Sequence, residues 1–322
     1  MRILIAGAGA LGSVFGGFLR RAGDQVTLLG RAAHLETIAR DGLRIDGLWG
    51  AHHVTGFTCV SDAAALRGPF DAILLPVKSP DTEAVARAVT PHLAADGVVL
   101  SLQNGLGNVE TIEAIAGAPR TLGARVIFGA ALSAPGHAVV TVFADPTAIG
   151  SLDPPAHPQR EAAARAWAAR LDAAGVPAVY TDRLSALLWG KVFYSAALNP
   201  LGALLRVHYG ALPERPTTRA IMDAVLDEAF AVAAADGAGL PWSNADAYRD
   251  EFYGRLVPST YDHRSSMLQD LARGRRTEID AISGEIVRRG RAHGVATPVN
   301  EALTWLIHEV EGRGCPAPTQ EA

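Results

Sequence analysis

The sequence predicts an α/β domain followed by an all-helical domain. Up to about residue 180, short β-branched runs alternate with amphipathic stretches, which is the pattern of a parallel sheet covered by helices. From about residue 183 onward, strand signals nearly vanish and apolar residues recur at helical spacing. At the usual ~150 residues per domain, 322 residues are enough for two domains. We expect them at residues 1–181 and 182–314, with a disordered tail at 315–322.

The expected strands and helices follow in a regular order. In the first domain the strands cover residues 3–6, 25–29, 71–76 and 98–102, and the helices cover 11–22, 33–40 and 81–92. Strand-like runs at 125–132, 138–143 and 147–150 indicate an antiparallel extension of the sheet, and a helix at 160–174 and a strand at 178–180 close the domain. The second domain is expected to hold helices at 184–198, 217–235, 265–272, 277–289 and 300–311.

Composition excludes several classes of partner. The net charge is -4, from 29 basic and 33 acidic residues, so no bulk electrostatic attraction favours nucleic acid or an anionic membrane. The two cysteines lie far apart, which argues against a disulfide framework and a cysteine-based zinc site and favours a reducing compartment. There is no signal-peptide pattern and no apolar run near the ~20 residues of a membrane span. We therefore expect a cytoplasmic protein without a metal.

The first strand leads directly into a glycine-rich turn that opens a helix. Its residues are Gly7, Ala8, Gly9, Ala10, Leu11 and Gly12. In a dinucleotide-binding turn the first glycine allows the bend, the second lets the backbone approach the pyrophosphate, and the third allows close helix packing. We expect this segment to bind a dinucleotide at the helix N-terminus. The alternative is an ordinary glycine-rich turn.

Arg31 follows the tip of the second strand, where no carboxylate is present. NAD sites usually place Asp or Glu there for the ribose 2'-hydroxyl, whereas NADP sites use Arg for the 2'-phosphate. The sequence therefore favours NADPH over NADH, the alternative being that Arg31 is only a surface charge. After the third and fourth strands come Lys78 and Asn104, which we expect in one crevice at the carboxyl edge of the sheet. Taken alone, Asn104 is equally explained as a turn former.

Of the 29 basic residues only Lys78 and Lys191 are lysines. Lys191, Ser195 and Asn199 are spaced four residues apart and share one face of an otherwise apolar helix. Burial lowers the pKa of a lysine ammonium toward the range in which it can donate a proton. The alternative is a lysine that snorkels to solvent, and Pro200 disfavours a helical conformation at Asn199.

Two later residues are explained by local structure when taken alone. Ser266 is expected to cap a helix, and Glu278 is expected in the first turn of the next helix, where the helix dipole favours a carboxylate.

Together these segments resemble the ketopantoate reductase (2-dehydropantoate 2-reductase) family over nearly the whole chain. The motifs that carry the resemblance are the glycine turn, the Lys78 strand end, Gln103-Asn104-Gly105, the helix at 189–200, and Ser265-Ser266-Met267-Leu268-Gln269-Asp270 followed by Thr277-Glu278-Ile279-Asp280. The resemblance implies a Rossmann-type domain joined to a helical domain, an active site in the cleft, and hydride transfer from NADPH to the C2 carbonyl of ketopantoate.

The resemblance also implies roles for individual residues. Lys191 matches the general acid that protonates the developing alkoxide, and Glu278 matches a carboxylate near the nicotinamide ribose and that lysine. The remaining residues match groups that hold substrate or cofactor. Asn104 and Ser266 match groups that hold both, and Asn199 matches a substrate-binding amide. Ala131 and Lys78 match positions at the cofactor. Ser195 stands one turn after Lys191, where the family commonly has a substrate-binding asparagine.

Ser195, Tyr209 and His263 all depart from asparagines common in the family, which changes the groups that read the rest of the substrate. Three functions stay open: reduction of ketopantoate to pantoate toward pantothenate and coenzyme A, action on another 2-oxo acid or a bulky 2-hydroxy acid, and a non-catalytic NADPH-binding module. The expected partner is a small 2-oxo acid, and a homodimer is left open.

Overall fold

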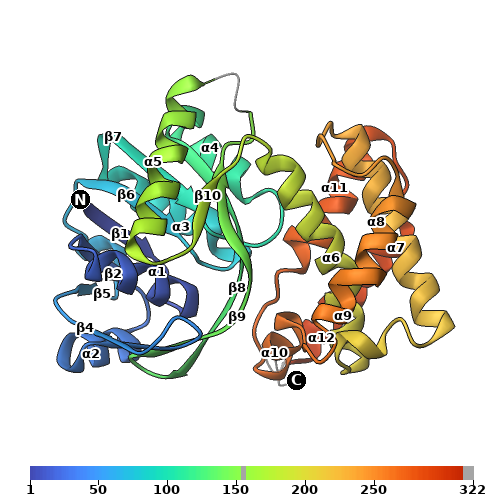
Figure 1. The fold of residues 1–322 in the computed structure, drawn as a ribbon, viewed down its shortest axis with the longest axis horizontal. Helices are drawn as coiled ribbons and strands as arrows, with labels where there is room; N and C mark the ends of the chain where they lie inside the picture. The colour runs from blue at the N-terminus through green and yellow to red at the C-terminus, as the bar shows by residue number, and fades with distance from the viewer. Residues whose placement is uncertain (154–156, 315–322) are drawn as a thin grey trace, which may run out of the picture. The chain divides into compact units, whose positions relative to one another are not determined.

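The computed structural model describes residues 1–153 and 157–314 (Figure 1). Contacts within the chain divide it into two compact units. The first consists of Met1–Asn104 and Asn108–Leu184, and the second of Gly105–Gly107 and the residues from Ser185 onward. The tail predicted at 315–322 lies outside the described residues. Within the described ranges no helix combines the length and apolar character needed to span a membrane.

The first unit is built on a ten-stranded mixed sheet with the order β4-β3-β9-β8-β7-β6-β1-β2-β5, and β10 pairs with β9. The strands are β1 (Arg2–Ala6), β2 (Gln25–Leu29), β3 (Leu43–Gly47), β4 (His52–Val54), β5 (Thr58–Val60), β6 (Phe70–Leu75), β7 (Leu93–Ser101), β8 (Thr121–Ala134), β9 (His137–Gly150) and β10 (Ala178–Tyr180). Neighbours from β5 to β8 along this order are parallel, and β8 and β9 are antiparallel. The predicted parallel sheet with an antiparallel extension is confirmed.

Helices cover both faces of this sheet (Figure 1). They are α1 (Ala10–Arg21), α2 (Ala32–Asp41), α3 (Thr82–Val89), α4 (Asn108–Ala116) and α5 (Pro158–Ala174). Strand β1 shows why they are needed, because Ile3 and Ile5 pack in the core with α1 and α5, whereas Leu4 and Ala6 pack in the core with α3 and α4. A strand that is apolar on both faces must be covered on both sides.

The second unit is helical in its described part. Its helices are α6 (Leu184–Leu205), α7 (Pro216–Ala235), α8 (Ala245–Glu251), α9 (Val257–Ser259), α10 (Ser266–Ala272), α11 (Ser283–His293) and α12 (Pro298–Gly314), with a π-helical turn at Phe252–Leu256. Helix α6 continues seven residues beyond its predicted end and runs through Pro200. Pro200 and its neighbour Leu201 are buried, so packing offsets the hydrogen bond that the proline removes.

Some predicted boundaries are wrong for physical reasons. The helix expected from residue 277 begins at Ser283, because residues 279–281 form a tighter 3-10 turn first. The runs at 138–143 and 147–150 are one strand, β9, whose middle residues are exposed and therefore lack apolar alternation. Strands β3, β4 and β5 and helix α4 were not predicted. Strands β4 and β5 have only three residues each, and β3 contains the charged residues Arg44 and Asp46, so none of them is a continuous apolar run.

Candidate functional site

The glycine turn is held tightly by the ends of its neighbouring strands. Gly7 has a φ of +125°, and the backbone N–H groups of Gly7 and Ala8 donate to the Leu29 carbonyl at 3.0 and 2.7 Å. A Cβ atom on Gly7 would lie 2.6 Å from Val77 Cγ1, and one on Gly12 would lie 2.2 Å from the Gly7 carbonyl oxygen. These two glycines are therefore required by the fold itself.

Gly9 differs from the other two glycines of the turn. A Cβ atom on Gly9 would meet no protein atom within 4 Å, so packing within the chain does not explain why a glycine stands there. Gly9 is the N-terminal cap of α1, and the first turn, which begins with Ala10 and Leu11, contains no acidic residue. Open space in front of unpaired helix N–H groups suits a phosphate group. This cradle fits a dinucleotide.

Arg31 caps the start of α2 and is exposed to solvent. One turn later, His34 is buried and connects three segments. Its Nε2 atom lies 2.9 Å from Ser13 Oγ in α1, and its Nδ1 atom accepts from the Gly136 backbone N–H at 3.0 Å. Burial, and secondly the charge of Arg31, lower the pKa of His34. The sequence reasoning missed this histidine, although its place on the apolar face of α2 was visible.

Lys78 and Asn104 follow neighbouring strand ends, as expected. Leu75 in β6 pairs with Ser101 in β7 in a parallel register. Beyond these ends, Ser79 Oγ donates to the Asn104 carbonyl at 3.1 Å, and Asn108 Nδ2 donates to the same carbonyl at 2.7 Å. A buried network continues this linkage through Thr82, Gln103 and Ser101. Lys78 is therefore next in sequence to Ser79, which bonds the Asn104 carbonyl. Ala131, the other predicted cofactor residue of this unit, lies exposed on β8.

In the second unit, helix α6 carries three predicted site residues on one face. Lys191 and Ser195 are half-buried, and Asn199 is buried. The Asn199 side-chain Oδ1 accepts from the Tyr209 hydroxyl at 2.5 Å, and its carbonyl accepts from Ser265 Oγ at 3.4 Å. The spacing that predicted a shared face is preserved because the helix is continuous through Pro200.

The local interpretations of Ser266 and Glu278 are both corrected. The cap of α10 is Ser265, whose hydroxyl accepts from the Leu268 N–H at 3.0 Å, and Ser266 is the exposed first helical residue. Glu278 is half-buried and precedes the 3-10 turn, with its carbonyl accepting from the N–H groups of Ala281 and Ile282. Neither residue therefore has the helix-terminus position that the sequence suggested.

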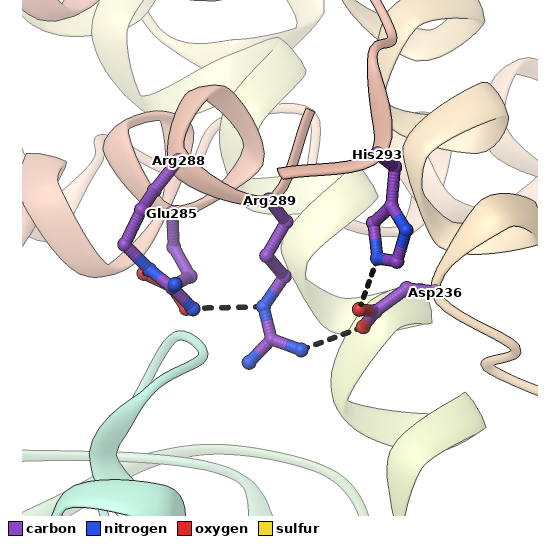
Figure 2. Close-up of polar contacts among 5 residues, drawn as sticks. All are labelled: Asp236, Glu285, Arg288, Arg289 and His293. Carbon is purple, nitrogen blue, oxygen red and sulfur yellow. Dashed lines mark hydrogen bonds and ion pairs between the residues drawn. The ribbon is translucent and has the colours of Figure 1, made fainter. Parts of the chain in front are cut away.

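An ion-pair network that the sequence did not predict joins the end of α7 to α11 (Figure 2). Arg289 lies between two carboxylates, with Nε 3.0 Å from Glu285 Oε1 and Nη1 2.6 Å from Asp236 Oδ2. His293 Nε2 lies 3.0 Å from the other Asp236 oxygen, and Arg288 pairs with Glu285. Burial alone would raise the pKa of Asp236, but the hydrogen bonds from His293 and Arg289 lower it. The network fixes α11, which follows the Glu278 turn.

The described residues provide a glycine turn that can hold a phosphate group, with Arg31 next to it. They also provide lysine, carboxylate, hydroxyl and amide side chains. Among the described residues no cluster of three or more His, Cys, Asp or Glu side chains is arranged to hold a metal ion. A parallel sheet with a glycine turn after its first strand is typical of dinucleotide-binding proteins, and an adjoining arginine is typical of those that bind NADP.

Comparisons with known proteins identify the family. The model "Ketopantoate reductase PanE/ApbA" matches residues 3–154, and its C-terminal counterpart matches residues 183–311. The 2-dehydropantoate 2-reductase of Aquifex aeolicus is 38% identical over 97% of each chain. The chain belongs to the ketopantoate reductase family, which confirms the resemblance seen in its motifs and the predicted fold class.

Solved structures agree with this assignment. A PanE/ApbA family ketopantoate reductase from Ralstonia eutropha JMP134 is 35% identical, with a TM-score of 0.86 over 98% of this chain and 99% of that one. A ternary structure of D-mandelate dehydrogenase with NADH and anilino(oxo)acetate is 29% identical, also with a TM-score of 0.86, over 98% of this chain and 99% of that one. The same fold therefore carries more than one named activity.

Proposed function

We propose that the protein catalyses NADPH-dependent reduction of 2-dehydropantoate (ketopantoate) to pantoate, a step toward pantothenate and coenzyme A. The observation that carries the proposal is the 38% identity, over 97% of each chain, to a 2-dehydropantoate 2-reductase. The protein is then an oxidoreductase acting on a CH–OH group. Both lysines of the sequence fall on motifs of the family, which a random distribution of two residues over 322 positions would rarely produce.

The first domain, residues 1–181, is assigned to the cofactor. The open space at Gly9 and the unpaired N–H groups of α1 support pyrophosphate binding by residues 7–12, and Arg31 supplies a cation for the 2'-phosphate. Lys78, Asn104, Ala131 and Glu278 are assigned to the rest of the cofactor site. When bound, NADPH supplies the hydride.

The second domain, residues 182–314, is assigned to substrate and proton transfer. Lys191 donates a proton to the C2 oxygen as negative charge grows there, which stabilises the transition state more than the ground state. Glu278 is assigned to orient the cofactor ribose and the lysine. The substrate-binding groups are Asn104, Ser195, Asn199 and Ser266.

The experiment that tests this function follows NADPH consumption at 340 nm with 2-dehydropantoate and a panel of other 2-oxo acids, with NADH as the cofactor control. We expect kcat/KM to be at least tenfold higher with 2-dehydropantoate than with any other acid, which is about 1.4 kcal/mol of discrimination. Tight NADPH binding without turnover of any acid would contradict the proposal and favour a non-catalytic NADPH-binding module.

A second function is supported by the similarity to D-mandelate dehydrogenase, which is 29% identical over nearly the whole chain. The same machinery would then reduce a bulkier 2-oxo acid or oxidise the corresponding 2-hydroxy acid. Ser195, Tyr209 and His263, which replace asparagines common in the family, are the residues that would change the specificity. In the same panel, a preference for a phenyl-substituted 2-oxo acid over 2-dehydropantoate would establish this second function.

Further proposals concern the setting of the enzyme. Its use of only two cysteines supports action in the reducing cytoplasm, and its net charge of -4 argues against nucleic acid as a partner. A homodimer is the proposed assembly. Light scattering of the purified protein would test it, with a mass near 67 kDa expected for two chains of 33.7 kDa.

A further inference from the structure

Tyr209 and Asn199 form a buried hydrogen bond within the second unit. Tyr209 is 3% exposed and Asn199 is 7% exposed. The tyrosine hydroxyl donates to Asn199 Oδ1 at 2.5 Å. Asn199 lies on the face of α6 that also carries Lys191, so a group that controls Asn199 acts on the predicted substrate site.

The backbone around Tyr209 holds its ring in place. The Tyr209 N–H donates to the His263 carbonyl, and the Gly210 N–H donates to the Tyr261 carbonyl, both at 2.9 Å. A Cβ atom on Gly210 would lie 2.1 Å from the Tyr261 ring, so the two segments are as close as a glycine allows. The Tyr209 ring also packs edge-on against Tyr194 at a centroid distance of 5.7 Å. The hydroxyl therefore has little freedom to leave Asn199.

The hydrogen bond runs from the Tyr209 hydroxyl to the amide oxygen of Asn199. Burial, and secondly the neighbouring Tyr194, raise the pKa of Tyr209 well above its ordinary value, so the phenol keeps the proton that it donates. An asparagine amide has one oxygen that accepts and one nitrogen that donates. With Oδ1 turned toward Tyr209, the amide can offer Nδ2 to a ligand as a donor.

We infer that Tyr209 is a positioning residue that fixes the Asn199 amide as a hydrogen-bond donor toward the substrate. The inference rests on the proposed function, in which Asn199 binds a 2-oxo acid. The site then selects a substrate that presents an acceptor oxygen, such as a carboxylate or carbonyl oxygen, to Nδ2. Without the phenol, the amide can rotate and present its oxygen instead, which repels such an acceptor.

The test compares Tyr209→Phe with the wild-type enzyme at saturating NADPH. We expect KM for the preferred 2-oxo acid to rise about tenfold, as loss of an oriented hydrogen bond does, while kcat stays within threefold and KM for NADPH is unchanged. The matched control is Tyr194→Phe. It removes the hydroxyl of a neighbouring half-buried tyrosine, which lies 2.7 Å from Thr260 Oγ1 rather than on Asn199, and it should leave KM within twofold.

Asn199→Ala and the double variant separate the inference from the proposed function. Asn199→Ala should raise KM, and adding Tyr209→Phe to it should have no further effect, because the group that Tyr209 orients is gone. If Asn199→Ala raises KM but Tyr209→Phe does not, the inference is wrong and the site assignment stands. If Asn199→Ala leaves KM unchanged, or the wild type reduces no 2-oxo acid, the site assignment fails and the inference with it. If Tyr209→Phe raises KM for NADPH as much as KM for the 2-oxo acid, the variant is generally damaged, and this result would also overturn the inference.

Discussion

The candidate site of the first unit consists mainly of backbone groups, whereas that of the second unit consists of side chains. In the first unit the cofactor cradle is made of backbone, in a turn of six consecutive residues that two glycines hold against adjacent strands. In the second unit the proposed substrate groups are side chains, and Asn199 is held by Tyr209, ten residues away, and by Ser265, 66 residues away. A site made of backbone is defined by local sequence and glycines, whereas a site made of side chains depends on tertiary contacts. Substitutions should therefore affect the two sites differently.

The largest expected effect comes from removing Lys191, the proposed proton donor in the second unit. Lys191→Ala should lower kcat by about 10²–10⁴-fold, the usual contribution of a positioned general acid. The measurement is the steady-state rate of NADPH oxidation with the preferred 2-oxo acid. A rate within threefold of the wild type would remove Lys191 from the acid role.

In the first unit, Arg31→Ala should weaken NADPH and spare NADH. A hydrogen bond to a charged group contributes about 1.5–3 kcal/mol, so the dissociation constant for NADPH should rise roughly ten- to a hundredfold. Fluorescence titration with both nucleotides gives the comparison. An unchanged ratio of the two affinities would mean that the 2'-phosphate is bound elsewhere.

Gly9 and Gly12 provide a contrast within the same turn. A Cβ atom on Gly9 meets only open space, so Gly9→Ala should leave the melting temperature nearly unchanged and weaken NADPH about tenfold through a clash with the ligand. A Cβ atom on Gly12 would lie 2.2 Å from the Gly7 carbonyl, so Gly12→Ala should lower the free energy of unfolding by about 1–3 kcal/mol. Thermal unfolding and nucleotide titration of both variants test this. Equal loss of stability in both would contradict a cradle at Gly9.

The smallest expected effect is a pH dependence of the first unit through His34. Its pKa is lowered in the fold, so the unfolded chain binds a proton more readily. The stability that neutral His34 provides is complete above its ordinary pKa of about 6.5 and is lost as pH falls through the lower pKa of the folded state. His34→Asn should flatten this part of the curve of melting temperature against pH, below about pH 6.5. A variant whose curve parallels that of the wild type would show that other groups cause the loss.

The same contrast explains what the sequence could predict. The glycine turn, Arg31 and the strand ends at Lys78 and Asn104 were predictable because each lies at a fixed position after an apolar strand. The bond from Tyr209 to Asn199, the link from His34 to Gly136 and the cap at Ser265 were not, because each depends on which segments pack together. Glu278 shows the intermediate case. Its motif was recognised from the sequence, but its conformation was assigned to a helix that begins five residues later.

The central claim is that Lys191 donates the proton and takes no part in binding the cofactor, so that proton donation can be lost while NADPH still binds. The most direct test measures, on the same preparation of Lys191→Ala, the dissociation constant for NADPH and the single-turnover rate of NADPH oxidation after mixing with the 2-oxo acid. We predict an NADPH affinity within threefold of the wild type and a rate lower by at least about a hundredfold. A parallel loss of affinity and rate, or an unchanged rate, would contradict the claim.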